Sequence, residues 1–230
     1  MSAHRPSVAI DGPVAAGKST MARRVAQGLG FIYIDTGAMY RALGWAARRA
    51  GVTGDEPQPV IDLLSHLRIE LRPQPDGTNQ VLVDGQDITG EIRSPDIGEL
   101  ASKLSTLPAV RRRLVALQQE MAAAGGVVME GRDIQTVVLP QAEVKIFLTA
   151  SAEERARRRW EELRQRGFEA KLEDVLAEIE ARDRRDTTRE DSPLKPAPDA
   201  VHVNTDGLTI EQVVDRVLAI AREKTAAPHK

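Results

Sequence analysis

The sequence predicts an α/β fold in which helices cover both faces of a parallel sheet. Short apolar segments of strand length alternate with longer segments of helical periodicity, an order typical of parallel strands joined by helical crossovers. Hydrophobic residues make up 41% of the 230 residues, enough for one large domain with a real core. The strand-like segments lie at 7–11, 31–35, 127–129, 144–148 and 201–204.

The N-terminal part of the chain contains two strands, each followed by a helix. The strand at 7–11 leads through a glycine-containing turn into a predicted helix over 18–29. The strand at 31–35 runs into a second helix that reaches about residue 50, where glycines stop it. This order supplies the first repeat of the parallel core.

The turn after the first strand has the form G-x-x-x-x-G-K-S. In a strand–turn–helix context its glycines let backbone N–H groups face an anion, Lys18 adds a positive charge, and the Ser19 hydroxyl can ligate Mg²⁺. The motif predicts a nucleoside triphosphate site and a sheet of the P-loop NTPase type. The residues expected to bind the triphosphate are Gly12, Pro13, Val14, Ala15, Ala16, Gly17, Lys18, Ser19 and Thr20.

The middle of the chain departs from the alternating order. Residues 67–93 combine period-two alternation, a turn signal at 73–77 and a hairpin signal at Asp84-Gly85. We therefore expect a small antiparallel sheet inserted into the α/β core. Residues 100–124 look helical, with a break at Pro108.

Two helices in the second half carry N-terminal capping signals. Ser151 with Glu154, and Thr209 with Gln212, have the spacing of capping boxes. Between them a further helix is predicted over 171–184.

Composition excludes several classes of protein. The net charge of -2 and the 3% aromatic content weigh against nucleic acid as a partner. The absence of cysteine excludes disulfides and thiolate catalysis, and the four histidines are too scattered for a metal cluster. No apolar run approaches the ~20 residues of a membrane span, and residues 1–6 lack a secretory-type apolar stretch, so we expect a cytoplasmic protein.

A phosphate loop alone is compatible with several activities. The chain lacks the Asn-Lys-x-Asp guanine reader of GTPases and the Ser-Gly-Gly-Gln signature of transport ATPases, so a small kinase remains. Three charged segments favour that interpretation: residues 35–41 at a helix start, 130–133 after a buried strand, and 182–189. The second lies where ligands bind in open sheets, at the carboxyl end of a strand.

These segments together resemble the bacterial cytidylate kinases over nearly the whole chain. The markers are Ile10 to Lys18, Asp35 to Arg41, Gly131-Arg132-Asp133, Val144 to Leu148, and Arg182 to Arg189. The resemblance implies a nucleoside monophosphate kinase that uses ATP with Mg²⁺ to phosphorylate CMP or dCMP. It also implies a monomer with small-molecule substrates and neither nucleic acid nor membrane as partner.

The resemblance implies roles for individual residues as well. The catalytic residues would be Lys18, Arg132, Arg158 and Arg159, and Ser19 would hold the metal. Arg41, Arg132 and Arg189 would clamp the acceptor phosphate. Ser102, Arg111 and Asp133 would read cytosine. Thr36 would lie near the monophosphate, and Arg182 and Asp186 would contact the ribose.

The same resemblance divides the chain into a core, an insert and a lid. The lid would be short and helical. The expected divisions are core with phosphate loop at 1–36, monophosphate-binding domain at 37–112 with the antiparallel insert at about 67–93, core at 113–150, lid at 151–170 and core at 171–230.

Two residues depart from the pattern of the family, and other activities stay open. Gln135 stands where we expect glycine, which would alter how the loop approaches the acceptor. Glu130 stands where we expect aspartate, and its longer carboxylate still reaches a metal-bound water. The alternatives are a small kinase acting on UMP, AMP or a shikimate-like alcohol, and a regulatory module that binds nucleotide without transferring phosphate.

Overall fold

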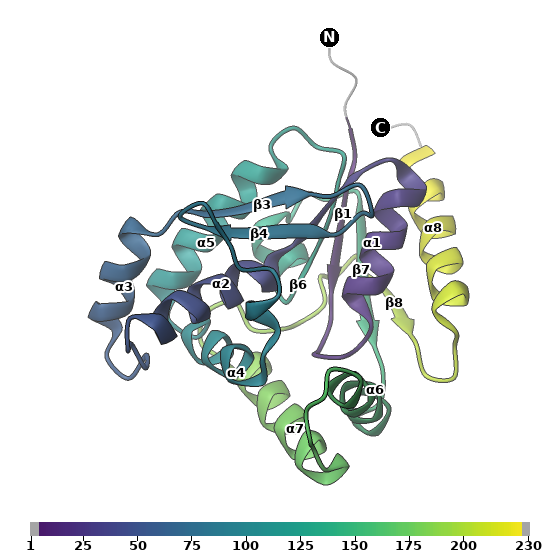
Figure 1. The fold of residues 1–230 in the computed structure, drawn as a ribbon. Coiled ribbons are helices and arrows are strands. Elements are labelled where there is room, and N and C mark those ends of the chain that lie inside the picture. Colours follow the sequence, from purple (N-terminus) through teal and green to yellow (C-terminus); the bar gives the residue numbers. More distant parts are fainter. Residues whose placement is uncertain (1–4, 227–230) are drawn as a thin grey trace.

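The centre of the protein is a five-stranded parallel sheet with strand order β2-β6-β1-β7-β8. The computed structural model describes residues 5–226 (Figure 1), so the outermost parts of the predicted core ranges, 1–4 and 227–230, lie outside it. The strands confirm the α/β class and the five predicted core segments. They are β1 (Ser7–Asp11), β2 (Ile32–Asp35), β6 (Val127–Gly131), β7 (Val144–Thr149) and β8 (Val201–Asn204).

Helices cover both faces of this sheet because its central strands are apolar on both sides. On one face Val8 and Ile10 share a cluster with α1 (Lys18–Leu29) and α8 (Ile210–Ala226), which lie side by side in Figure 1. On the other face Ala9 and Met129 pack with α5 (Pro108–Ala122). The carboxyl ends of the strands stay free of these helices and are available for a site.

The predicted antiparallel insert is present beside the core (Figure 1). Its strands are β3 (Ile69–Pro73), β4 (Asn79–Val83) and β5 (Gln86–Asp87). Asp84 and Gly85 join the last two with φ of 50° and 82°, the two positive values that a type I′ turn needs. The period-two pattern and the hairpin signal were therefore sufficient to predict this sheet.

Asn79 fastens the insert to the core. Its Nδ2 donates to the Tyr33 carbonyl at 3.0 Å, and its Oδ1 accepts from the Asp35 N–H at 3.1 Å. Both backbone groups belong to β2, an edge strand of the parallel sheet. A single side-chain amide thus satisfies part of an edge that would otherwise lack partners.

Four helices share one hydrophobic cluster with the insert: α2 (Thr36–Arg49), α3 (Pro57–His66), α4 (Pro95–Leu104) and α5. The break at Pro108 is confirmed, but α4 begins at Pro95 rather than at residue 100. Pro95 occupies the first helical turn, where its missing N–H costs nothing. Gly44 lets α2 approach α4 closely, since a Cβ there would lie 3.1 Å from the Ile97 carbonyl oxygen.

Two antiparallel helices, α6 (Ala152–Gln165) and α7 (Leu172–Thr188), lie at the lower end of the molecule in Figure 1. The prediction ended α7 at Arg184, four residues early. The hydroxyl of Thr187 donates to the Asp183 carbonyl and that of Thr188 to the Arg184 carbonyl, each at 2.7 Å, which satisfies acceptors of the last turn. Within residues 5–226, no helix is both long and apolar enough to cross a bilayer.

Candidate active site

The phosphate loop is held by close backbone packing. A Cβ at Gly12 would lie 2.1 Å from the Leu148 carbonyl oxygen, so only glycine fits beneath β7 at that point. Gly17 has φ of 90° and begins α1 without a side-chain cap. The first N–H groups of α1 are therefore free to face an anion.

Lys18 is buried at the mouth of this loop. Its Nζ donates to the Pro13 carbonyl at 2.6 Å. Burial, followed by the positive charge of Arg132, lowers the pKa of Lys18 below its ordinary 10.5, and Glu130 and Asp11 oppose that shift. A bound polyphosphate would supply the counter-charge that the ammonium lacks.

The oxygen atoms beside the loop suit a magnesium ion. Tyr33 donates its hydroxyl to Glu130 Oε1 at 2.6 Å, and the Glu130 carboxylate also interacts with Ser19. Burial and the nearby Asp35 raise the pKa of Glu130, so a cation would relieve an unfavourable charge. Hydroxyl and carboxylate oxygens are the donors that Mg²⁺ prefers, so Ser19 and Glu130 fit such an ion.

A cavity opens at the carboxyl ends of β2 and β6, next to the loop. The cavity is lined by Lys18, Ser19 and Arg159. It is also lined by every residue that the family resemblance assigned to the acceptor nucleotide. Those residues are Thr36, Arg41, Ser102, Arg111, Arg132, Asp133, Arg182, Asp186 and Arg189. The structure therefore brings them all to one place.

The cavity is strongly positive although the whole chain is slightly acidic. Nine basic and five acidic side chains line it. Arg41 Nε, Arg182 Nε and Arg189 Nη2 are buried and have no hydrogen-bond partner within the described part of the chain. Buried guanidinium donors require acceptors, and a phosphate is the acceptor that planar N–H groups match best.

Carboxylates keep the guanidinium groups in place. Arg132 Nε lies 2.9 Å from Asp186 Oδ2, and Arg41 Nη2 lies 3.0 Å from Asp35 Oδ2. Burial would raise the pKa of Asp186, but Arg132 and Arg182 hold it below its ordinary value. Burial and Arg132 lower the pKa of Arg182 to about 10.

Asp35 and Thr36 form the start of α2 within the cavity. The Asp35 carboxylate accepts from the Ala38 N–H at 2.9 Å and so caps the helix while it also holds Arg41. The Thr36 hydroxyl donates to the Glu130 carbonyl at 2.6 Å. These contacts couple α2 to β6 beside the phosphate loop.

Three lining residues of the cavity, Ser102, Arg111 and Asp133, carry groups suited to a base. Arg111 Nη2 forms a buried ion pair with Asp133 Oδ2, and Arg189 Nη2 lies 4.0 Å from Asp133 Oδ1. Ser102 Oγ accepts from Arg185 Nη1 at 3.0 Å. The sequence analysis included Arg185 in the charged segment 182–189 but assigned no role to it.

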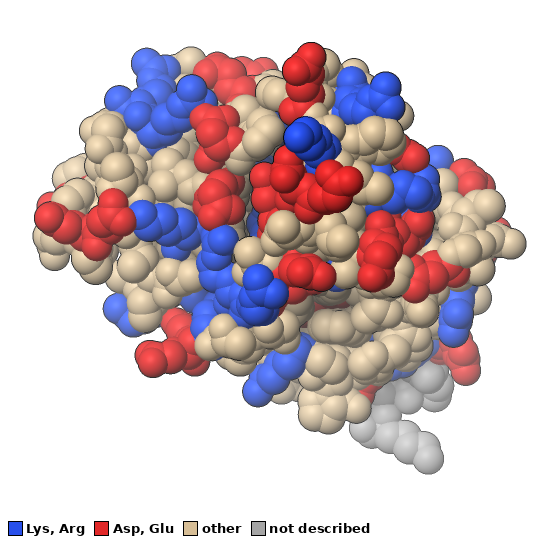
Figure 2. Space-filling view, turned by 90° about the horizontal axis from the view of Figure 1, so that it is seen from below, with Lys and Arg blue, Asp and Glu red and all other residues tan. Residues whose placement is uncertain are grey.

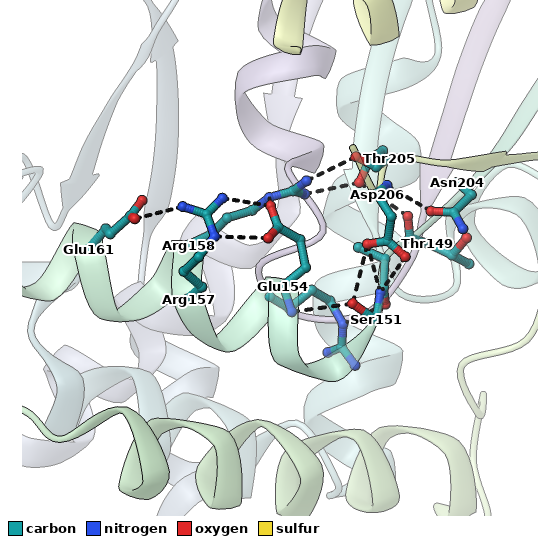
Figure 3. Close-up of polar contacts among 11 residues, drawn as sticks. Thr149, Ser151, Glu154, Arg157, Arg158, Glu161, Asn204, Thr205 and Asp206 are labelled. Atoms are coloured by element: carbon teal, nitrogen blue, oxygen red, sulfur yellow. Dashed lines mark hydrogen bonds and ion pairs between the residues drawn. The ribbon is translucent and has the colours of Figure 1, made fainter. Parts of the chain in front are cut away.

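A second cavity lies on the other side of the loop. It is lined by Ala15 to Thr20, by Arg157 and Arg158 of α6, and by Thr205 and the start of α8. Arg158 donates to Thr205 Oγ1 and to the Thr205 carbonyl at 2.9 and 3.0 Å (Figure 3). The two predicted lid arginines thus face different cavities, Arg159 the first and Arg158 the second.

The capping box predicted at Ser151 is only half formed. Ser151 Oγ accepts from the Glu154 N–H at 3.3 Å, but the Glu154 carboxylate pairs with Arg157 and Arg158 (Figure 3). Asp206 takes the reciprocal place and accepts from the Ser151 N–H at 3.0 Å. By contrast, both bonds of the box between Thr209 and Gln212 are present.

Arg155 is a buried residue that supports the phosphate loop, and the sequence prediction assigned it no role. Its Nη1 donates to the Val14 carbonyl of the phosphate loop at 3.3 Å, and its Nη2 lies 2.6 Å from Asp183 Oδ2. It thereby ties the loop to both α6 and α7. One face of α6 carries Arg155, Arg159 and the buried Leu163 at a spacing of four residues. This spacing could have indicated from the sequence that Arg155 faces the interior of the protein.

The face formed by α6 and α7 carries interspersed charges of both signs. Figure 2 looks onto this end of the molecule from below and shows blue and red side chains intermingled rather than one basic patch. Phosphate-backbone binders present clustered Lys and Arg. This face therefore does not have the pattern of a nucleic-acid surface.

Comparisons with known proteins agree with this geometry. A family model described as cytidylate kinase matches residues 8–223. A cytidylate kinase of Geobacillus kaustophilus is 52% identical, covering 96% of this chain and 98% of that protein. One of Pelotomaculum thermopropionicum is 51% identical, covering 93% and 95%. A solved structure of an uncharacterized Eubacterium ventriosum protein has a TM-score of 0.50 at 10% identity, covering 97% of this chain and 100% of that one, and shows a likeness of fold alone.

Proposed function

Because the chain belongs to the cytidylate kinase family, we infer that it transfers the terminal phosphoryl group of ATP to CMP or dCMP. The products are ADP and CDP or dCDP. The activity is that of a nucleoside monophosphate kinase, whose acceptor is a phosphate rather than an alcohol.

One observation supports the site most directly: the phosphate loop and the acceptor arginines line the same cavity. Lys18 and Ser19 belong to the loop, and Arg41, Arg132 and Arg189 face them from three other segments. A regulatory module that only binds ATP needs no second anion site. Two anion sites in one cavity are what transfer between two phosphates requires.

On the donor side we assign the triphosphate to Gly12–Thr20, with Lys18 against its terminal groups. The second cavity, between the loop and the start of α8, would take the nucleoside of ATP. Ser19 and Glu130 would hold Mg²⁺, which supplies charge neutralisation to the phosphates when it is bound. Arg158 and Arg159 would join the phosphates from α6, within the lid that we propose at 151–170.

On the acceptor side Arg41, Arg132 and Arg189 would hold the monophosphate, and Thr36 would lie beside it. Asp133 would accept from the cytosine amino group, with Arg111 and Ser102 serving the carbonyl and ring nitrogen. Uracil would present a carbonyl to the Asp133 carboxylate, and a site built on hydrogen bonds rejects such a mismatch. Arg182 and Asp186 would contact the ribose.

The mechanism needs no general base. A phosphate monoester has a second pKa of about 6, so the acceptor is already largely a dianion at neutral pH. In-line transfer then depends on orientation and charge neutralisation. The arginines overcome the repulsion between two anions, and closure of the insert and the lid would exclude the water that hydrolyses ATP.

An acceptor panel tests the function. Purified protein is mixed with ATP, Mg²⁺ and one of CMP, dCMP, UMP or AMP, and ADP release is measured. We expect rapid release with CMP and dCMP and slow release with UMP and AMP. Equal rates with all four acceptors would contradict the assigned base readers. The monomeric state and a cytoplasmic location stay predictions.

A further inference from the structure

Gln135 is a buried polar residue that the transfer mechanism does not use. It is 1% exposed and lies in the π-helical turn Ile134–Val138, directly after Arg132 and Asp133. Burying an unpaired amide costs free energy, so such a residue stays in a core only where its hydrogen bonds are made.

Both ends of the Gln135 amide are hydrogen-bonded to other segments. Nε2 donates to the Ile146 carbonyl of β7 at 2.6 Å. Oε1 accepts from the Ala197 N–H at 3.2 Å. Ala197 belongs to residues 189–200, which join α7 to β8 without regular secondary structure. One side chain therefore links this segment to the turn that carries Asp133.

The linked segment begins with an acceptor arginine. Arg189 Nε donates to the Ser192 carbonyl at 2.7 Å, which bends its guanidinium back into the segment. Its Nη2 is buried without a hydrogen bond and lies 4.0 Å from Asp133 Oδ1. Leu194 and Ala197 are buried beneath, so the position of Arg189 depends on how the segment is fastened.

The backbone of the turn has an anchor of its own. The buried Asp11 carboxylate accepts from the N–H groups of Ile134 and Gln135 at 3.0 and 2.8 Å. Any residue except proline at position 135 keeps its backbone hydrogen bond to Asp11. Only the side chain reaches Ala197, so a glycine would keep the turn and lose the link to the segment of Arg189.

We propose that Gln135 is a positioning residue that sets the spacing between Asp133 and Arg189, and thereby the affinity for the acceptor monophosphate. The inference rests on the proposed function, because it assumes that these two residues bind the acceptor. It assigns no contact between Gln135 and substrate. Its effect on the donor site is nil, because the amide reaches no residue of the phosphate loop.

Gln135→Met tests this, because it keeps the length of the side chain and removes both hydrogen bonds. Calorimetric titration with CMP in the absence of ATP should give a Kd about tenfold higher than that of the wild type, the size expected when hydrogen bonds that hold a binding group are lost. The Kd for ATP should not change. Loss of CMP and ATP affinity together, or unchanged CMP affinity in a folded variant, would overturn the proposal.

Gln135→Glu provides a rescue. A protonated carboxyl donates and accepts like the amide, whereas the ionised form has no donor for the Ile146 carbonyl. Burial at this 1% exposed position raises the pKa of a carboxyl well above its ordinary value of about 4.3. The ratio of variant to wild-type Kd for CMP should therefore approach one at pH 6 and rise towards pH 8.5 as the glutamate ionises. A ratio independent of pH would count against the proposal, and this series decides even where the methionine variant fails to fold.

Asp199→Asn is the matched control. Asp199 pairs with Lys145 Nζ at 3.0 Å and so ties the same segment to the same strand, with a carboxylate that is 60% exposed. Asp199→Asn keeps an oxygen acceptor for the Lys145 ammonium, so it should change the Kd for CMP less than about twofold, because an ion pair with a solvent-exposed partner contributes little. Wild-type turnover of CMP, measured in the same series, tests the proposed function by itself. The proposed function and the positioning role of Gln135 can therefore fail independently.

Discussion

The donor loop and the acceptor cavity are built in opposite ways. The loop consists of consecutive residues, Gly12–Thr20, and its geometry rests on two glycines and the free start of α1. The acceptor cavity draws its residues from α2, α4, α5, the end of β6 and α7, over positions 36 to 189. The proposed triphosphate site is thus local in the sequence, whereas the residues proposed to bind the monophosphate meet only after α2, α4, α5 and α7 have packed at the end of the sheet.

The two regions also differ in how they hold charge. The loop has one buried ammonium, Lys18, with the Pro13 carbonyl as its hydrogen-bond acceptor. In the cavity several guanidinium groups are paired with carboxylates, as in Arg132–Asp186 and Arg111–Asp133. Removing one residue should therefore disable the loop but only weaken the cavity.

The largest effect is expected at Lys18. Lys18→Met removes the charge that faces the transferring group, and kcat for CMP should fall by about 10²–10³, the size found when one transition-state donor is lost. ADP release at saturating CMP measures it. Lys145→Met is a control, because Lys145 is similarly buried but lies on β7 away from the cavity, paired with Asp199. Near-normal turnover of the Lys18 variant would contradict the loop assignment.

The next effect is expected at Asp133. Asp133→Asn replaces two acceptor oxygens with one oxygen and one N–H donor, which can face the carbonyl of uracil. The kcat/KM for CMP should fall about 10²-fold while the preference for CMP over UMP shrinks. The Kd for ATP should stay the same. An equal loss of ATP and CMP binding would mean that Asp133 supports the fold rather than reads the base.

A smaller effect is expected at Arg41, because other guanidinium groups share its task. Arg41→Met should raise the KM for CMP about tenfold and leave kcat nearly unchanged, as for one lost charged hydrogen bond. Asp35 keeps its capping bond to the Ala38 N–H, so α2 should stay folded. Arg49→Met, on the exposed end of the same helix, is the control. A fall in kcat for Arg41→Met as large as that for Lys18→Met would contradict the prediction that one substitution disables the loop but only weakens the cavity.

The contrast between the regions also explains what the sequence could predict. The phosphate loop, the core strands and the antiparallel insert follow from local patterns, because glycine placement and period-two or apolar runs act over a few residues. The acceptor residues came from the family resemblance, since nothing local relates Arg41 to Arg189. The contacts of Arg155 and Arg185 and the two links of Gln135 were not predicted, because their partners lie 11 to 141 residues away in the chain.

The smallest effect concerns protons. Burial and Arg132 lower the pKa of Lys18 in the free protein, and a bound triphosphate would raise it again. Between the lowered pKa and the higher pKa of the complex, binding must take up a proton, so ATP affinity should fall as pH rises above neutrality, by at most about tenfold per pH unit. Below the lowered pKa Lys18 is charged in both states and contributes no slope. Calorimetry at pH 8.5 in two buffers of different ionisation enthalpy measures the uptake. Lys18→Arg, whose guanidinium stays charged, should abolish the proton uptake. Equal uptake in both proteins would mean that the titrating group lies outside the loop. The ammonium of the loop would then respond to pH no more than the paired arginines of the cavity do.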